Sequence, residues 1–334
     1  MEGTEMTDVV LEWLLEEENP SVRYFALTSL LEVPLNDPIV IQAKEDIMRN
    51  GIVPKILSKQ NADGSWGDPN RFYLDTYRGT VWTLLILAEL ACNPQHPQII
   101  KACEFLLEHS QIEETGGFSY VGNSVTHLPM HNGVVPCLCG NMVYALSKLG
   151  YLDDIRVQRG IDWIVEFQRT DDGDQPRPRG KMYDKHQNCW GKHSCHMGVA
   201  KALKAFSQIP EAEITDERRA KRDQFIEYFL QHHIHMKSHN TDEIGCPSWL
   251  KFGFPRMYQT DIIELTEIMA DLHVEDVRLR EALQVIRNKQ NPDSTWNLDH
   301  SFNGRMVVTI EKKGFPSKWI TLKALKTLKA YREM

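Results

Sequence analysis

A repeat of amphipathic segments runs along most of the chain, and it limits the choice of fold more than any other sequence feature. Five glutamines each close such a segment, at spacings of 51, 57, 63 and 59 residues. Turn residues follow most of them, as in Asp63-Gly64-Ser65. A period of about 50–60 residues fits one pair of helices with its loops. The five glutamines are Gln60, Gln111, Gln168, Gln231 and Gln290.

A second helix is expected in each unit, because apolar residues recur there at helical spacing. With an N-terminal pair over 9–15 and 22–31, the chain holds about six helix pairs, or twelve helices, and almost no strand signal. The pairs at both ends carry the same apolar helices without polar caps, which favours a closed ring over an open solenoid. We therefore predict an all-α fold, an (α/α)6 toroid, as one domain over residues 1–334. The second helices are expected over 76–90, 141–149, 196–206, 260–272 and 318–331.

Composition excludes several classes of partner. The chain has 42% apolar and 25% charged residues, and 38 basic against 46 acidic side chains give a net charge of −8. Neither sign forms a long block, so we expect no nucleic acid and no anionic bilayer as partner. No apolar run approaches the roughly 20 residues that span a bilayer, and the acidic start lacks the features of a signal peptide. We expect a cytoplasmic protein without stable membrane insertion.

Two stretches resemble a known repeat motif. Gln60–Trp66 (QNADGSW) resembles the Gln-Trp motif of the squalene-cyclase and prenyltransferase α/α-toroid superfamily, and Gln290–Trp296 (QNPDSTW) is a second copy with Ser294 in place of glycine. The resemblance implies the toroid fold over nearly the whole chain, and the chain most resembles the bacterial members. It specifies the reaction only weakly, because the superfamily includes cyclases, prenyltransferase β subunits and thioester domains.

The reaction motifs of the superfamily are missing. Class II terpene cyclases protonate an alkene with an Asp-x-Asp-Asp acid, and the string Asp171-Asp172-Gly173-Asp174 has a different order and is expected to be a capped turn. The Asp-x-Cys and distant His pattern of prenyltransferase β subunits is not reproduced either. A cyclase that starts by protonation is therefore not favoured.

Reactive residue types gather where the inner helices of the predicted toroid begin. In such a fold the inner helices are parallel, so their N-termini open at one mouth. Helix N-termini present unpaired N–H groups and a positive dipole end, which favour thiolates and anions. The segments at these starts are 23–24, 75–78, 136–141, 193–196, 256–261 and 317–319.

Clustered cysteine and histidine side chains indicate a zinc site. In a chain without an export signal, such clusters indicate metal or catalytic chemistry before disulfides. The adjacent Cys195-His196 pair is similar to the zinc-binding Cys-His pair of lanthipeptide cyclases, which are also toroids, although Met197 here precedes Gly198. The alternative is a set of ordinary buried thiols and histidines. The predicted ligands are Cys137, Cys189, Cys195 and His196, with Cys139 as the alternative to Cys137.

Further side chains near the same mouth predict substrate contacts. Guanidinium, ammonium and phenol groups suit a diphosphate or carboxylate, although surface cations also pair with acidic residues. Aromatic residues there suit an isoprenoid-like chain, unless they only fill the barrel core. We assign Arg256, Arg305, Lys318, Tyr77 and Trp190 to substrate binding, and Tyr258, Asp261 and His193 to catalysis. The stretch His232-His233-Ile-His235-Met-Lys-Ser-His239 either is solvated surface or lines the mouth.

Three functions remain open from these residues. The leading hypothesis is a zinc-dependent transferase or cyclase that acts at the barrel mouth on an isoprenoid-like or thiol-bearing small molecule. The second is a metal-free isoprenoid cyclase or transferase. The third is a non-catalytic toroid that binds a lipid or peptide and holds a structural metal. Three protein ligands and a water at the metal would favour the first, and four protein ligands the third.

Overall fold

The computed structural model describes residues 7–332 except residues 124 and 181, and helices dominate this part of the chain. Helices α5 and α7 are buried along their whole length, whereas α8 and α12 bury only one face, so the helices form an inner and an outer layer. The inner layer consists of α2 (Pro20–Phe25), α5 (Thr80–Glu89), α7 (Pro136–Leu146), α9 (His196–Phe206), α11 (Ile262–Asp271) and α13 (Lys318–Ala330).

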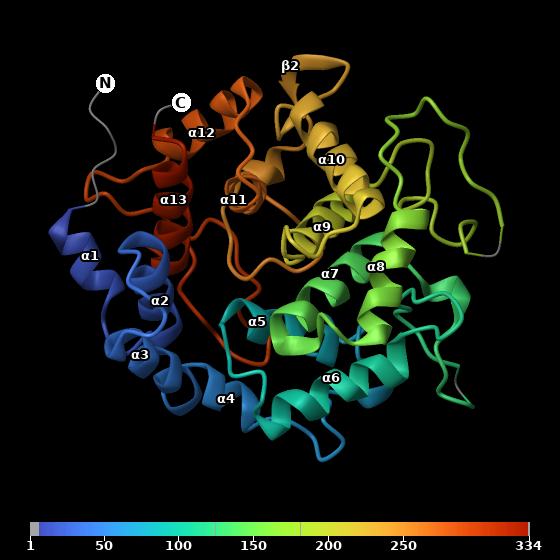
Figure 1. Ribbon diagram of the computed structural model, residues 1–334, viewed down its shortest axis with the longest axis horizontal. Helices are drawn as coiled ribbons and strands as arrows, with labels where there is room; N and C mark the ends of the chain where they lie inside the picture. The colour runs from blue at the N-terminus through green and yellow to red at the C-terminus, as the bar shows by residue number, and fades with distance from the viewer. Residues whose placement is uncertain (1–6, 124, 181, 333–334) are drawn as a thin grey trace.

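The outer helices surround this layer, as Figure 1 shows for α3, α4 and α6 below it and for α8, α10 and α12 around its other side. They are α1 (Asp8–Leu14), α3 (Pro38–Arg49), α4 (Val53–Leu57), α6 (Pro97–Ser110), α8 (Ile155–Phe167), α10 (Asp216–Gln231) and α12 (Arg280–Asn288). A small antiparallel hairpin, β1 (Met236–Lys237) and β2 (Asn240–Ile244), is the one sheet in the described residues.

The inner helices close into a ring. Neighbours pack in the order α5, α7, α9, α11, α13, and α13 packs against α2. The hydroxyl of Ser21 on α2 donates to the carbonyl of Leu90 at the end of α5, at 2.8 Å, which completes the ring. The predicted (α/α)6 toroid is therefore confirmed. No helix in the described part of the chain is both long and apolar enough to span a bilayer.

The two copies of the repeat motif make the same contacts. The indole N–H of Trp66 donates to the carbonyl of Ile56 at 2.9 Å, and that of Trp296 donates to the carbonyl of Ile286 at 2.8 Å. Their backbone N–H groups donate to the hydroxyls of Thr80 on α5 and Thr321 on α13, each at 3.0 Å. Each buried tryptophan thus ties the end of an outer helix to the next inner helix.

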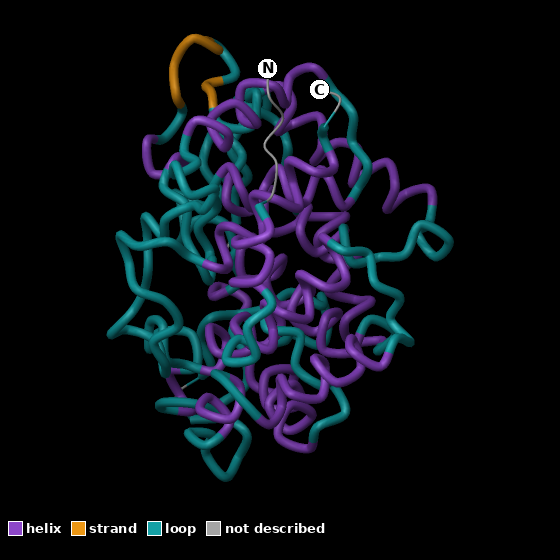
Figure 2. The backbone as a smooth tube through the Cα atoms, turned by 90° about the vertical axis from the view of Figure 1, so that its left-hand side faces the viewer, coloured by secondary structure: helices purple, strands orange, loops and turns teal. Residues whose placement is uncertain are grey.

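Loop length distinguishes the two ends of the barrel. From α4 onward, the segments that lead from an outer to an inner helix are long, whereas those that lead from an inner to an outer helix are short. Many of the loop segments lie on one side of the helical body, the left side of Figure 2, where the hairpin also lies. We call the end where α5, α7, α9, α11 and α13 begin the amino mouth, and the other end the carboxyl mouth. The long segments are 58–79, 111–135, 168–195, 232–261 and 289–317.

The non-glycine residue in the second motif copy predicts a stabilising substitution. Ser294 has φ of +66°, while the corresponding Gly64 has φ of +98°. Because a side chain disfavours this left-handed region, Ser294→Gly is expected to raise the free energy of unfolding by about 0.5–1 kcal/mol in urea denaturation. Gly64→Ala is the matched control and is expected to destabilise by more than about 1 kcal/mol. A destabilised Ser294→Gly protein would contradict the prediction.

Candidate functional site

Three thiols from three segments of the chain meet at the amino mouth. Cys137 lies in the first turn of α7, Cys195 is the N-cap residue of α9, and Cys189 lies in the long segment before α9. The thiol of Cys189 hydrogen-bonds the sulfur of Cys195, and Cys195 in turn raises the pKa of Cys137 on α7. Cys189 and Cys195 are half-buried, whereas Cys137 is buried.

Two glycines allow α7 and α9 to approach closely enough for this arrangement. A Cβ on Gly140 of α7 would lie 2.4 Å from the carbonyl carbon of Lys201 on α9. A Cβ on Gly198 of α9 would lie 2.7 Å from the Cβ of Pro136 on α7. Because real Cβ contacts are not this short, only glycine fits at either position. The backbone contact brings the first turns of the two helices, and with them the thiols, together.

The electrostatic surroundings of the thiols differ. The hydrogen bond from Cys189 lowers the pKa of Cys195 to about 7, although burial opposes this, and the N–H groups of Gly198 and Met197 add to the effect. Burial raises the pKa of Cys137 to about 12. Of these two thiols, Cys195 is therefore the one that ionises near neutral pH.

The structure corrects the predicted ligand set at His196 and Cys139. The His196 ring stacks on Trp249 with centroids 3.9 Å apart, and burial lowers its pKa to about 3. The sulfur of Cys139 accepts the N–H of Phe118 at 3.2 Å, on the side of α7 away from Cys195. His196 therefore faces the outer layer, and Cys137 rather than Cys139 belongs to the thiol group.

The four predicted zinc ligands do not converge. Within the described residues, ligand atoms of three or more His, Cys, Asp or Glu side chains come within 4.8 Å of one another only at Asp172, His193 and His239. A tetrahedral zinc site with Zn–S of about 2.3 Å needs closer donors than the thiols and His196 provide. The geometry at the thiols therefore does not match the predicted zinc site.

An aromatic wall stands beside the thiols. Tyr77 packs against Phe302 at 4.1 Å and against Trp82 at 5.0 Å between centroids, and Trp82 also contacts Tyr73 at 4.7 Å. Burial raises the pKa of Tyr73, and the charges that Cys137 and Cys189 carry when ionised raise it further. The wall therefore lies near the thiols. It consists of Tyr73, Tyr77, Trp82, Tyr120, Tyr258 and Phe302.

The residues assigned to substrate binding and catalysis divide into two groups. Tyr77 and the partly exposed Tyr258 belong to the aromatic wall, and the exposed guanidinium of Arg305 lies 4.8 Å from the Tyr77 ring centre. Trp190, in contrast, is buried edge-on against Tyr183, at 5.1 Å, and against Trp163 of α8.

The other cations and the predicted acid are held in internal contacts. Asp261 caps α11 by accepting the N–H of Glu264 at 2.8 Å, and it accepts the guanidinium Nε of Arg256 at 2.7 Å. The ammonium of Lys318 donates to Glu16 and to the carbonyl of Trp13. Arg256, Lys318 and Asp261 are thus engaged in structural pairs, and Arg305 is the predicted cation that faces outward.

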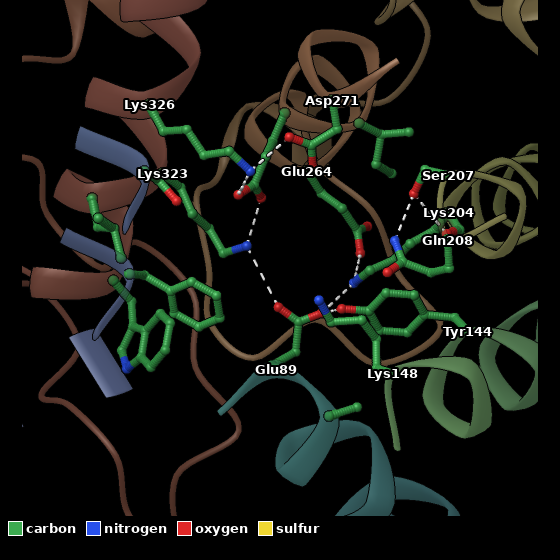
Figure 3. A pocket seen from close by; sticks show the side chains of 17 residues that line it. Glu89, Tyr144, Lys148, Lys204, Ser207, Gln208, Glu264, Asp271, Lys323 and Lys326 are labelled. Atoms are coloured by element: carbon green, nitrogen blue, oxygen red, sulfur yellow. Dashed lines mark hydrogen bonds and ion pairs between the residues drawn. The ribbon is translucent and has the colours of Figure 1, made fainter. Parts of the chain in front are cut away.

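A cavity of about 120 Å³ lies on the barrel axis toward the carboxyl mouth (Figure 3). Apolar side chains of Phe25, Trp319 and Leu322 cover part of its wall. The rest is charged, and the acidic and basic groups point toward one another across the axis. The charged lining residues are Glu89, Glu264, Glu267, Asp271, Lys148, Lys204, Lys323 and Lys326.

Ion pairs join the inner helices around this cavity. Lys204 of α9 lies 2.5 Å from Glu89 of α5 and 2.9 Å from Glu264 of α11. Lys201 lies 2.7 Å from the other oxygen of Glu264, and Lys323 of α13 lies 2.6 Å from Glu267. Because the charges are paired, they can be buried at moderate cost.

The sequence carried a signal for this network that our predictions did not use. Charged residues recur three residues apart within otherwise apolar inner helices, as Lys201 and Lys204, Glu264 and Glu267, and Lys323 and Lys326 do. Residues three apart lie on one helical face. Such a face inside an apolar helix indicates charges turned toward the axis.

No family model matches the chain, and no curated protein matches it by sequence. Solved structures with a similar fold include an unsaturated glucuronyl hydrolase specific for heparin, at 10% identity and a TM-score of 0.49, covering 97% of this chain and 86% of that chain. A protein from Actinoplanes follows at 14% identity and 0.45, covering 94% and 90%. A variant of the type II terpene cyclase MstE from Scytonema, in complex with geranylgeranyl dihydroxybenzoate, follows at 15% and 0.43, covering 95% and 88%.

Loss of one carboxylate in the cavity predicts a large destabilisation. Glu264→Gln leaves Lys201 and Lys204 buried without their shared partner, which is expected to cost about 3–5 kcal/mol of unfolding free energy at pH 7 in urea denaturation. The exposed ion pair of Glu211 with Arg222 offers the control, since Glu211→Gln is expected to cost less than about 1 kcal/mol. Equal costs for the two variants would contradict a stabilising network.

The same carboxylate predicts a pH dependence of stability. Burial raises the pKa of Glu264, but Lys201 and Lys204 lower it by a larger amount. The result is a pKa of about 2, compared with an ordinary 4.5. Its ionisation therefore contributes stability that is complete above pH 4.5 and is lost as the pH falls toward 2. The difference between wild type and Glu264→Gln is expected to shrink over that range. A difference that stays constant down to pH 2 would contradict the lowered pKa.

The surroundings of Cys195 predict selective alkylation. At pH 7, limiting iodoacetamide is expected to modify Cys195 before the buried Cys103 and Cys139, as measured by peptide mass spectrometry. Cys189→Ala removes the hydrogen bond that lowers the pKa of Cys195, so its alkylation is expected to slow by about tenfold. The half-buried Cys246 is the internal reference, and its rate is expected to stay unchanged. Equal slowing of Cys195 and Cys246 would argue against the hydrogen bond.

Proposed function

We propose that the chain is an enzyme that acts at the amino mouth, with the sulfur of Cys195 as nucleophile. The observation that carries the proposal is the meeting of Cys137, Cys189 and Cys195 next to the aromatic wall. The three residues come from separate parts of the chain, and Gly140 and Gly198 hold their helices at backbone contact. A close arrangement of reactive groups on the loop-rich end of a rigid barrel is typical of active sites.

Cys195 is the thiol best placed to react. It is half-buried, so a substrate at the mouth can reach it, whereas Cys137 is buried behind it. The backbone N–H groups of Met197 and Gly198, in the first turn of α9, lower the pKa of this thiol and so stabilise negative charge on its sulfur. Cys189 hydrogen-bonds the same sulfur and holds it in position. Cys189 therefore acts as a positioning residue.

The aromatic wall and Arg305 indicate the kind of substrate. Flat rings suit an unsaturated or aromatic apolar group, and the outward guanidinium beside Tyr77 suits an anionic group such as a diphosphate or carboxylate. An apolar chain would not lie favourably in the cavity on the axis, because eight charged side chains line it. We propose a small molecule, isoprenoid-like or aromatic, that is bound on the mouth and outside the axis.

The reaction step uses the residues of the chain alone. The sulfur of Cys195 forms a bond to an electrophilic carbon of the substrate, and the leaving group departs with the electron pair of the broken bond. A second nucleophile, water or an acceptor substrate, then bonds to the same carbon, and the electron pair of the broken C–S bond returns to the sulfur. The proton of Cys195 passes to solvent. Zinc is not part of this step, because the ligand atoms of the thiols and His196 do not converge as a zinc site requires.

A covalent trap tests this function. Incubation with an allylic diphosphate and with an acyl thioester, followed by intact-mass and peptide mass spectrometry, is expected to give one adduct on Cys195 from one of the two probes. Cys195→Ser is expected to abolish the adduct, and Cys246→Ser is the matched control that retains it. Saturable binding of a probe without an adduct would favour the non-catalytic toroid, and modification of Cys195 no faster than of Cys246 would refute a dedicated nucleophile.

A further inference from the structure

A second cluster of potential ligands lies outside the thiol group, where two long segments of the amino mouth meet. Asp172 follows α8, and His193 lies at the other end of the same segment, just before α9. His239 lies in the turn between β1 and β2. Ligand atoms of these three side chains lie within 4.8 Å of one another. One carboxylate therefore faces two imidazoles from different segments.

The distances around Asp172 suit one shared ion. One oxygen of Asp172 lies 3.3 Å from Nδ1 of His193, and the other lies 3.3 Å from Nε2 of His239. The second oxygen also lies 3.9 Å from Nε2 of His232, at the end of α10. Donor atoms bound to one ion at about 2.0–2.2 Å lie roughly 3–4 Å from each other. The Nε2 atoms of His239 and His232 match that spacing to Asp172, and a ligand atom of His193 lies within 4.8 Å of those of Asp172 and His239.

His232 supplies an independent observation that points to a cation. Its side chain is only 9% exposed. Its Nδ1 lies 2.6 Å from the carbonyl of Tyr228, and since a carbonyl only accepts, Nδ1 carries the hydrogen. In the neutral ring, the lone pair of Nε2 then faces the carboxylate of Asp172 at 3.9 Å, beyond hydrogen-bond distance. Two electron-rich atoms facing each other in this way are stabilised by a cation between them.

The supporting contacts are those that metal-binding histidines use. Nδ1 of His193 lies 3.0 Å from the carbonyl of Asp172, which leaves Nε2 for a metal, as at His232. The hydroxyl of Ser238 donates to Asp172. Gly173 has φ of +94°, and a Cβ there would lie 2.8 Å from the His193 ring, so glycine leaves room for the ring. Backbone carbonyls and a hydroxyl thus orient the ligands.

We propose that Asp172, His193, His239 and His232 bind a divalent transition-metal ion of the Zn²⁺ type. Imidazole and carboxylate donors suit Zn²⁺ and its neighbours in the first transition row better than Mg²⁺ or Ca²⁺. The exposed His193 and His239 leave the site open for an ion to enter. The ion joins segment 168–195, which carries Cys189 and Cys195, to segment 232–261. The bound ion thereby fixes the position of the loop that carries Cys189 and Cys195.

Metal titration of the full chain tests the site. After treatment with a chelator, calorimetry with Zn²⁺ alone is expected to show one ion per chain. Asp172→Asn and His239→Gln are each expected to weaken binding by at least about tenfold, because each removes a ligand. His131→Gln changes an exposed histidine outside the cluster and is expected to change the affinity less than twofold. Absence of binding, or equal binding by all variants, would overturn the site.

Cobalt distinguishes this site from a thiol site. Co²⁺ bound by imidazole and carboxylate gives weak visible bands only, whereas Co²⁺ bound by thiolate adds an intense charge-transfer band in the near ultraviolet. We expect the first spectrum, unchanged in Cys189→Ala and lost in Asp172→Asn. The charge-transfer band, lost in Cys189→Ala, would place the ion at the thiols and overturn the proposal. Circular dichroism that is equal in Asp172→Asn and wild type shows that the variant is folded.

Discussion

The ion pairs across the barrel axis are the interaction on which the arrangement of the inner helices depends. Glu89, Lys204, Glu264 and Lys323 come from α5, α9, α11 and α13, and each charge is neutralised by a neighbour on another helix (Figure 3). A shift of one helix along its axis would leave a buried charge unpaired, at a cost of several kcal/mol. Apolar contacts alone tolerate such a shift more easily. The network therefore sets the register of α5, α9, α11 and α13, and the hydroxyl of Tyr144 joins α7 to it by donating to Glu89 at 2.7 Å.

A fixed register has consequences at the amino mouth. Cys137 and Cys195 each lie in or before the first turn of an inner helix, so their distance follows from the relative position of α7 and α9. Gly140 and Gly198 allow these helices to touch. The carboxyl mouth, in contrast, has short connections, and most of the charges near it are held in ion pairs. The half of the barrel at the carboxyl mouth thus provides rigidity, and the loop-rich half at the amino mouth carries the reactive groups.

The sequence was sufficient for the fold but not for the site. The repeat period and the buried Trp66 and Trp296 act locally, each within one helix pair, so their pattern is readable along the chain. The direction of a side chain at a helix start is not readable in this way. His196 follows Cys195 directly, yet one helical step turns its ring toward Trp249 while the thiol faces Cys189. Adjacent residues on a helix point about 100° apart, so adjacency does not place both at one ion.

The sequence by itself determined the all-α class, the helix pairs and the concentration of thiols and aromatic residues at one end, because these follow from hydrophobic period and from the polarity of a helix. The tertiary structure alone decided which of these residues meet. It paired Arg256 with Asp261 and Lys318 with Glu16, and it brought His232 and His239 to Asp172 from another segment. Such partners lie far apart in the chain, and the packing of whole helices and loops decides their distances.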